Sequence, residues 1–182
     1  MIQSAPNETA PAVFLDRDGT LMKEVNYCGD PKKVEVFTDV PDALALLKSR
    51  GYKLIVVTNQ SGIGRGYFGV EQYEAVNGEL GRQIGPGVID ASYFCPDAPD
   101  IPSQRRKPSA AMVFEAQRDH KLDLRRSYFI GDKAIDIECG RNAGVRTILV
   151  QTGYGSGERA AVADFDAADF TAAANWILSQ PA

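Results

Sequence analysis

The sequence predicts an α/β fold with a doubly wound parallel sheet of the Rossmann-like type, covered by helices on both faces. Two observations support this fold. Short apolar runs alternate along the chain with longer amphipathic segments, and polar residues follow directly after three of the runs. Because ligands bind beyond the carboxyl ends of the strands in such sheets, those polar residues are candidates for a functional site.

Four apolar runs are predicted strands and five amphipathic segments are predicted helices. The strands cover residues 12–15, 54–57, 128–130 and 147–150, and the helices cover residues 40–50, 71–82, 109–121, 133–142 and 168–179. Gly78 weakens the prediction for the helix at 71–82, and four prolines within residues 96–108 predict a constrained loop. A further strand, without assigned bounds, is expected between Thr58 and Lys107. The aromatic residues at strand positions, Phe14, Tyr93, Phe94, Tyr128 and Phe129, are predicted to belong to the core, and Trp176 is expected to anchor the last helix.

Length and composition limit the domain organisation and the partners. The 182 residues suit one domain, which we place at residues 12–182 after a flexible tail at residues 1–11. The net charge of −4 argues against a nucleic-acid partner. No apolar run is long enough to cross a bilayer, and residues 1–11 lack the features of a signal peptide. Three widely spaced cysteines suggest no disulfide framework. We therefore expect a cytoplasmic monomer without membrane or nucleic-acid partners.

Two acidic residues, Asp16 and Asp18, follow the first predicted strand. Turn chemistry accounts for Asp18 and Gly19 but not for Asp16. A calcium loop would need a ligand and a glycine where Thr20 and Leu21 stand. A carboxylate can instead attack phosphorus and form an acyl phosphate, and a cation such as Mg2+ then offsets the repulsion between the acids and an anionic substrate. We expect Asp16 to be the nucleophile and Asp18 the general acid and base.

Two further segments can hold the charge of a phosphoryl group. Thr58 and Asn59 come at the end of the second predicted strand and can donate hydrogen bonds to phosphate oxygens, although the same pair also starts ordinary turns. Lys107 belongs to a basic cluster that could simply be a solvated face. Pro108 at the entrance of a helix would nevertheless fix the backbone there, so that Lys107 has a fixed direction. The N-terminus of a helix also favours anions.

Asp132 follows the strand predicted at 128–130 and could complete the cation site that Asp16 begins. Asp136, one turn further on, is expected to be a supporting charge, with direct binding of the cation as the alternative. Together these pieces resemble the haloacid dehalogenase superfamily of phosphohydrolases. Its four motifs are matched in order by Asp16-x-Asp18-Gly19-Thr20, Thr58, Lys107 and Gly131-Asp132-x3-Asp136. The sequence resembles more closely the D-glycero-D-manno-heptose 1,7-bisphosphate phosphatases, neighbours of the histidinol-phosphate phosphatases, through residues 14–20, 58–66, 106–108 and 131–133.

The resemblance implies an activity and a role for individual residues. The implied enzyme is a Mg2+-dependent phosphatase that removes the 7-phosphate of D-glycero-D-manno-heptose 1,7-bisphosphate, in the synthesis of heptose precursors for lipopolysaccharide or nucleotide-activated heptose. The alternative substrates are histidinol phosphate and other small sugar phosphates. The implied catalytic residues are Asp16, Asp18, Thr58 and Lys107, and the implied magnesium ligands are Asp16, the Asp18 carbonyl and Asp132. The implied substrate contacts are Glu24, Val25, Asn26, Tyr27, Asn59, Gln60, Ser61, Arg65, Arg106 and Lys133.

One segment departs from the family pattern. The heptose phosphatases commonly carry a Cys-x-His and Cys-x-Cys zinc loop before the Arg-Lys-Pro segment. Here Asp97 stands where the histidine is expected after Cys95, and residues 100–105 contain no cysteine. Because a structural zinc ion needs four nitrogen or sulfur ligands, we predict no zinc and expect the prolines to stiffen this loop instead.

The intervals between the motifs are too short for a separate cap domain, so we expect an open site rimmed by residues 21–36, 61–69 and 95–106. Lys23, Arg65, Arg105 and Arg106 lie on those loops and could engage a second anionic group.

Two other classes of function remain open. Gly64-x-Gly66-x-x-Gly69 formally matches a dinucleotide fingerprint, but it starts several residues after its strand and leaves the acids unexplained. A catalytically silent binder of sugar phosphates is the other alternative. Phosphate release that depends on Mg2+ would separate an enzyme from both.

Overall fold

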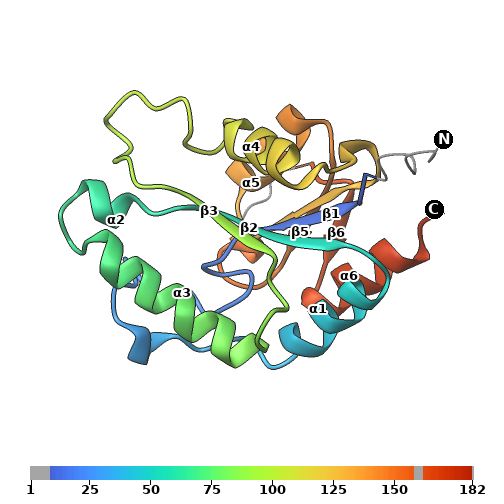
Figure 1. Ribbon diagram of the computed structural model, residues 1–182, viewed down its shortest axis with the longest axis horizontal. Coiled ribbons are helices and arrows are strands. Elements are labelled where there is room, and N and C mark those ends of the chain that lie inside the picture. Colours follow the sequence, from blue (N-terminus) through green and yellow to red (C-terminus); the bar gives the residue numbers. More distant parts are fainter. Residues whose placement is uncertain (1–8, 158–161, 182) are drawn as a thin grey trace, which may run out of the picture.

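A computed structural model describes residues 9–157 and 162–181 and confirms the predicted α/β fold. Six parallel strands form one sheet in the order β3-β2-β1-β4-β5-β6 (Figure 1). The strands are β1 (Ala12–Leu15), β2 (Lys53–Asn59), β3 (Ala91–Cys95), β4 (Tyr128–Gly131), β5 (Arg146–Val150) and β6 (Phe165–Ala167). The helices are α1 (Val40–Ser49), α2 (Ser61–Gly64), α3 (Val70–Ile84), α4 (Ala111–His120), α5 (Ala134–Ala143) and α6 (Phe170–Ser179), with short 3-10 helices at Pro31–Lys33, Leu124–Arg126 and Gly155–Gly157.

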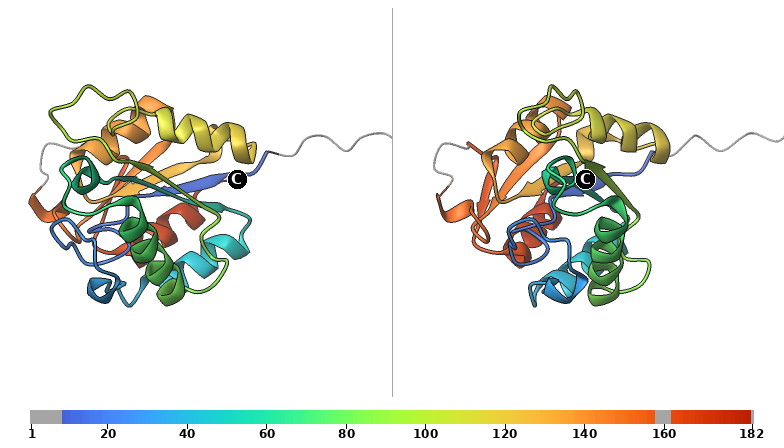
Figure 2. Two further views of the ribbon diagram at one scale, coloured as in Figure 1. Left: turned by 60° about the vertical axis from the view of Figure 1, so that its left-hand side comes forward. Right: turned by 90° about the vertical axis from the view of Figure 1, so that its left-hand side faces the viewer.

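The helices cover both faces of the sheet. α1, α3 and α6 lie on one face, and α4 and α5 lie on the other (Figure 2). Each face of the sheet has its own hydrophobic core, and successive side chains of β1 point to opposite faces. Val13 and Leu15 pack with α1, α3 and α6, and Ala12 and Phe14 pack with α4 and α5. All four residues are fully buried, as expected for a central parallel strand.

The predicted elements are all present, including the strand through Tyr93 and Phe94, which is β3, but the edge strand β6 and the short helix α2 were not predicted. β3 and β6 lie at the two edges of the sheet and are only partly buried, so neither has the continuous apolar pattern of an inner strand. Tyr93 and Phe94 are therefore only partly buried, and of the two Tyr93 packs against the core that contains Phe14 and Phe129. Helix α2 has only four residues, two of them glycine, and carries no helical periodicity.

The ends of the described chain are held by specific contacts. Residues 1–8 of the predicted tail lie outside the described residues, whereas Ala10 forms a β-bridge with Leu122 and accepts a hydrogen bond from the Asp123 N–H at 2.9 Å. Trp176 anchors α6 as predicted, because its ring stacks on Phe165 with a centroid distance of 5.0 Å. In the part of the chain that is described, no helix combines the length and the apolar character needed to cross a membrane.

The chain reverses its direction of travel across the sheet between β1 and β4, and this arrangement positions the site. From β1 the chain proceeds outward through β2 and β3, then returns to β4 and proceeds the other way through β5 and β6. Two long segments, residues 16–39 and 96–110, follow β1 and β3 at the carboxyl end of the sheet, and neither contains a domain of its own. The polar residues after β1, β2 and β4 therefore meet at the crevice where such folds bind ligands.

Two helical glycines provide a test of this packing. A Cβ added to Gly140 in α5 would lie 2.6 Å from Thr147 Cγ2 and 2.9 Å from Phe129 Cβ, whereas one added to Gly78 in α3 would meet nothing within 4 Å. We predict that Gly140→Ala destabilises the protein by about 1–3 kcal/mol through overpacking. The matched Gly78→Ala should stabilise it by roughly 0.5–1 kcal/mol because alanine is the better helix former. Urea unfolding measures both values, and changes of the same sign would contradict the close approach of α5 to the sheet.

Candidate active site

A buried lysine lies at the centre of the site. Lys107 Nζ is 2.8 Å from Asp16 Oδ1, 2.6 Å from Asp136 Oδ1 and 2.9 Å from the Val57 carbonyl oxygen. Its side chain is 1% exposed. Burial alone would lower the pKa of Lys107, but the charges of Asp136 and Asp16 outweigh it and raise that pKa above its ordinary value. The lysine therefore remains a cation and holds two carboxylates together.

The backbone of Lys107 is held in place by an asparagine. Asn59, at the end of β2, accepts a hydrogen bond from the Lys107 N–H at 3.0 Å and donates one to the Lys107 carbonyl at 3.2 Å. The expectation that Pro108 fixes Lys107 at a helix entrance is wrong, because α4 begins only at Ala111. A side chain from the neighbouring strand orients the lysine instead.

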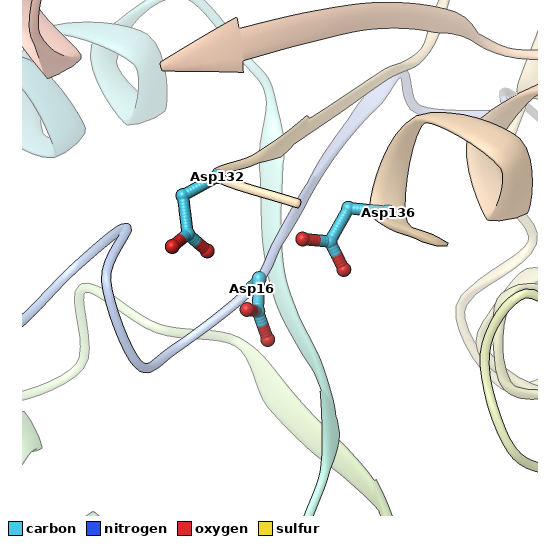
Figure 3. Close-up of side chains that lie close together, drawn as sticks. All are labelled: Asp16, Asp132 and Asp136. Atoms are coloured by element: carbon cyan, nitrogen blue, oxygen red, sulfur yellow. The ribbon is translucent and has the colours of Figure 1, made fainter. Parts of the chain in front are cut away.

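Three aspartates that are far apart in the sequence meet beside Lys107. Figure 3 shows Asp16 at the end of β1, Asp132 just after β4 and Asp136 in the first turn of α5, with their carboxylates around a common space. One oxygen from each lies within 4.8 Å of the others, and all three residues are buried. The cluster combines the predicted cation ligands with Asp136, for which the sequence left both a supporting role and direct binding of the cation open.

The three carboxyl groups are in different electrostatic states. Burial alone would raise the pKa of Asp16. The positive charges of Lys107 and Lys133 together outweigh this effect, so the pKa of Asp16 lies below its ordinary value. Burial and the charge of Asp16 raise the pKa of Asp132 to about 7. The same two causes raise the pKa of Asp136 to about 6, against the opposing effect of Lys107. Asp16 is thus held as an anion, while Asp132 lacks a neutralising partner of comparable strength.

The donor chemistry of this cluster fits Mg2+, which prefers carboxylate oxygens and keeps several waters. The Asp132 carboxylate accepts hydrogen bonds from the Tyr154 N–H at 2.8 Å and the Thr20 hydroxyl at 3.5 Å, which fix its position. Two glycines with positive φ, Gly19 and Gly153, lie so close that a Cβ on either would collide with the Asp132 carboxylate. Asp16 and Asp136 each turn one carboxylate oxygen, Oδ1, toward Lys107, and Asp136 Oδ2 also accepts a hydrogen bond from the Lys133 N–H at 3.1 Å. All three carboxylates lie close enough together to hold one ion.

Asp18 is held apart from this cluster by a second buried cation. Its carboxylate accepts hydrogen bonds from Arg17 Nε at 3.0 Å, from Arg17 Nη2 at 3.1 Å and from Gln60 Nε2 at 2.9 Å. The Arg17 side chain is fully buried, and its guanidinium lies over the ring of Tyr73 at 5.5 Å. The two acids of the first motif therefore have separate cationic partners, Lys107 for Asp16 and Arg17 for Asp18.

A cavity of about 340 Å3 opens above these groups. Its lining contains Asp16, Asp18, Glu24, Val25, Asn26, Tyr27, Thr58, Asn59, Gln60, Ser61, Arg106, Lys107 and Lys133 from the predicted site, together with Cys28, Gly62, Ile135 and Tyr154. The predicted substrate contact Arg65 is not part of the lining, because it lies exposed at the end of α2. The cavity thus brings together nearly all of the predicted site residues.

Tyr154 is the main site residue that sequence reasoning missed. Besides its N–H contact to Asp132, its ring lies 4.7 Å from Lys133 Nζ, which also pairs with Glu24 at 3.0 Å. Tyr154 follows β5, whose carboxyl end lies at the same edge of the sheet as those of β1 and β4. Because Tyr154 follows the strand predicted at residues 147–150, its place in the sequence could have identified it as a site residue.

Two of the cations expected to meet a second anionic group have other partners. Arg105 forms an ion pair with Glu115 of α4 at 2.7 Å, and Lys23 pairs with Glu35. Arg106 donates to the Asp97 carbonyl at 3.0 Å and lines the cavity. Arg106 and Lys133 therefore supply the positive charge on the cavity wall beyond Lys107.

The loop at residues 96–108 does not offer the ligands of a structural zinc site. Cys95 Sγ lies 3.5 Å from Asp97 Oδ2 and 3.5 Å from Ser103 Oγ, so its neighbours are oxygen atoms. Cys28 and Cys139 are buried elsewhere. A four-ligand site of nitrogen and sulfur cannot form from these residues.

The glycines of the formal dinucleotide fingerprint have separate local roles, and only Gly64 packs closely against another segment. The Gly64 N–H donates to the Pro96 carbonyl at 2.9 Å, and a Cβ at Gly64 would lie 2.7 Å from that oxygen. Gly69 caps the start of α3. The segment is therefore not the tight strand-to-helix turn that binds a pyrophosphate.

Comparisons with known proteins agree with this geometry. Residues 104–174 match the HAD-hydrolase-like family model. The chain is 38% identical over 188 residues to a D-glycero-D-manno-heptose-1,7-bisphosphate 7-phosphatase of Thermosynechococcus vestitus, covering 93% of this chain and 96% of the relative. It is 40% identical over 153 residues to a D-glycero-beta-D-manno-heptose-1,7-bisphosphate 7-phosphatase of Haemophilus ducreyi, covering 78% and 84% of the two chains.

A solved structure has the same fold over nearly the whole chain. The D,D-heptose 1,7-bisphosphate phosphatase from B. bronchiseptica, complexed with magnesium and phosphate, superposes with a TM-score of 0.86 at 28% identity, covering 92% of this chain and 98% of that one. With the identity and coverage of the curated relatives, these findings establish that the chain belongs to the D-glycero-D-manno-heptose-1,7-bisphosphate 7-phosphatase family of HAD-like hydrolases.

Proposed function

We propose that this phosphatase removes the 7-phosphate of D-glycero-D-manno-heptose 1,7-bisphosphate through a phosphorylated Asp16, with Mg2+ as cofactor. The observation that carries the proposal is the buried Lys107, which contacts Asp16 at the base of a polar cavity. The family supplies the identity of the sugar. A small phosphorylated sugar would be the partner, and we place the enzyme in the cytoplasm as a monomer, in the synthesis of heptose precursors for lipopolysaccharide or nucleotide-activated heptose.

The first step is attack of the Asp16 carboxylate on phosphorus. Asp16 suits this role because Lys107 and Lys133 outweigh the cost of its burial and keep it ionised. As the bond from Asp16 to phosphorus forms, the bond from phosphorus to the sugar oxygen breaks. Splitting the hydrolysis into two displacements lowers the barrier of a reaction that is very slow without a catalyst.

Asp18 handles the proton in both steps. It gives a proton to the departing sugar oxygen, and it takes one back from the water that then attacks phosphorus and releases Asp16. Its carboxylate is held by Arg17 and Gln60 at the wall of the same cavity, beside the nucleophile. A fixed orientation favours both proton transfers, because the reacting atoms must lie within hydrogen-bond reach.

Lys107 and the Thr58 hydroxyl would hold the negative charge of the transferring group. Both belong to the cavity lining next to Asp16. Preorganised donors in a buried site can contribute several kcal/mol to transition-state stabilisation. Mg2+, held by Asp16, Asp132 and the Asp18 carbonyl, would neutralise charge between the nucleophile and the phosphoryl oxygens. Arg106 and Lys133 on the cavity wall would bind the second phosphate.

A phosphate-release assay with Mg2+ tests the proposed function directly. Both anomers of heptose 1,7-bisphosphate, fructose 1,6-bisphosphate and histidinol phosphate form the substrate panel, and we predict the highest kcat/KM with a heptose bisphosphate. Asp16→Asn should lose at least about 10^4-fold in kcat because the nucleophile is removed. Asp166→Asn, at an exposed position of β6, serves as the matched control. If kcat/KM for histidinol phosphate equals that for the heptose bisphosphates, the proposed substrate is wrong. If Asp16→Asn keeps the kcat of the wild-type protein, the proposed mechanism is wrong.

The ion pairs of Lys107 make a prediction about stability. Lys107→Met leaves two buried carboxylates without their cation, so we expect a loss of about 3–5 kcal/mol together with loss of activity. Adding Asp136→Asn removes one of these charges and should restore part of the stability but none of the activity. Urea unfolding and phosphate release measure the two effects. If the double variant unfolds as easily as Lys107→Met, the pairing of Lys107 with Asp136 contributes nothing to stability.

The raised pKa values of Asp132 and Asp136 predict how Mg2+ and pH act together. Without metal, both carboxyls bind protons more tightly in the folded protein than in the unfolded chain. Their contribution to stability is present below about pH 4 and is lost as the pH rises through about 6 and 7. Mg2+ requires the ionised Asp132, so the increase in Tm caused by Mg2+ should be larger at pH 8 than at pH 6.

Thermal unfolding in EDTA and in excess Mg2+ measures this difference. Asp132→Asn is the control, because it removes the titrating ligand and should flatten the dependence on pH. An increase in Tm that is the same at both pH values would exclude Asp132 as a ligand that must lose a proton.

A further inference from the structure

Gln60 links the two catalytic groups that lie on the same side of the cavity. Its amide nitrogen donates hydrogen bonds to Asp18 Oδ2 at 2.9 Å and to Thr58 Oγ1 at 2.9 Å. The residue is 5% exposed. Its backbone N–H donates to the Cys95 carbonyl at 2.8 Å, which fixes the position of the residue between the ends of β2 and β3. Both protons of one amide group are thus used on two neighbouring site residues.

Arg17 fixes which end of the amide faces these groups. Its Nη2 donates to Gln60 Oε1 at 3.0 Å, and a guanidinium has no acceptor. The amide oxygen must therefore face Arg17, and the nitrogen must face Asp18 and Thr58. Arg17 is itself held by Asp18, by the ring of Tyr73 and by Asn77 Oδ1 at 3.4 Å, so the whole network has one orientation.

The orientation of the amide sets the direction in which Thr58 can donate. The amide nitrogen has no lone pair to accept a hydrogen bond, so the hydroxyl proton of Thr58 cannot point toward Gln60. Thr58 lines the cavity, and its proton is available to a phosphoryl oxygen there. The second amide proton holds the Asp18 carboxylate on the same wall.

We propose that Gln60 is a positioning residue, whose amide, oriented by the buried Arg17, directs the Thr58 hydroxyl proton toward the transferring phosphoryl group and holds Asp18 for proton transfer to the sugar oxygen. This inference rests on the proposed function. It assigns Gln60 a role different from the contact with substrate that the family resemblance implies, since both amide protons are already used within the protein.

The test reverses the polarity of this group at nearly constant shape. Gln60→Glu replaces the donor by an acceptor, which draws the Thr58 proton away from the cavity and repels Asp18. We expect kcat for the sugar phosphate to fall by on the order of 100-fold, as for other lost donors to a developing charge. Proton donation matters less when the leaving group is a stable anion, so kcat for p-nitrophenyl phosphate should fall by a clearly smaller factor.

A double-mutant cycle separates positioning from a general loss of structure. Thr58→Val should lower kcat in the wild-type background and have little further effect in Gln60→Glu, because the hydroxyl is already misdirected there. If the glutamate variant does not fold, Gln60→Met, which removes both donors to Thr58 and Asp18 without adding a charge, should lower kcat for the sugar phosphate more than kcat for p-nitrophenyl phosphate, because Asp18 is no longer held.

Gln83 provides the matched control. It is a partly buried glutamine of α3 that also bridges two segments, with contacts to the Val36 N–H at 3.1 Å and the Val34 carbonyl at 2.9 Å, remote from the cavity. Gln83→Glu should lower Tm and leave kcat within about two-fold, as expected for a change outside the site.

The outcomes distinguish the inference from the proposed function. If the wild-type protein releases no phosphate from any monoester, the proposed function fails. If the wild-type protein is active but Gln60→Glu has an unchanged kcat, the positioning role is overturned. It is also overturned if Gln60→Glu lowers kcat by the same factor with both substrates and Thr58→Val lowers kcat equally in both backgrounds.

Discussion

The structure of the site depends on one buried ammonium group. Lys107 holds Asp16 and Asp136 within ion-pair distance in a place where an unpaired carboxylate would be very costly to bury. The lysine comes from the loop after β3, whereas the two acids come from β1 and α5. One cation therefore joins three distant parts of the chain and keeps Asp16 ionised. Asp132 lies next to this group without an equal partner, which makes the cluster suited to a divalent ion.

Sequence reasoning could locate most of this arrangement because the fold obeys a simple rule. Asp16, Thr58 and Asp132 each follow a fully buried apolar run, and parallel strands bring those positions to one edge of the sheet. The burial of both faces of the inner strands made the runs easy to recognise. Sequence reasoning expected a strand at Tyr93 and Phe94 without assigning its bounds and missed β6, because an edge strand needs no continuous apolar pattern.

The pairing between polar side chains could not be predicted from the sequence. Asn59 and Gln60 both follow an apolar run, and the family resemblance implies that both contact the substrate. In the folded chain Asn59 binds the Lys107 backbone, and Gln60 joins Thr58 to Asp18. Such pairings depend on distances across the sheet, which neither residue type nor spacing encodes. Arg65 shows the converse: its charge suited a phosphate, but its position at the end of α2 leaves it outside the cavity.

The central claim is that Asp16 becomes phosphorylated during turnover. Acid-quenching the enzyme with its substrate and reducing it with borohydride converts an aspartyl phosphate to homoserine, which peptide mass spectrometry can locate. The account predicts homoserine at position 16, only when substrate and Mg2+ are both present. Turnover without homoserine at position 16, or with homoserine at position 18, 132 or 136 instead, would contradict it.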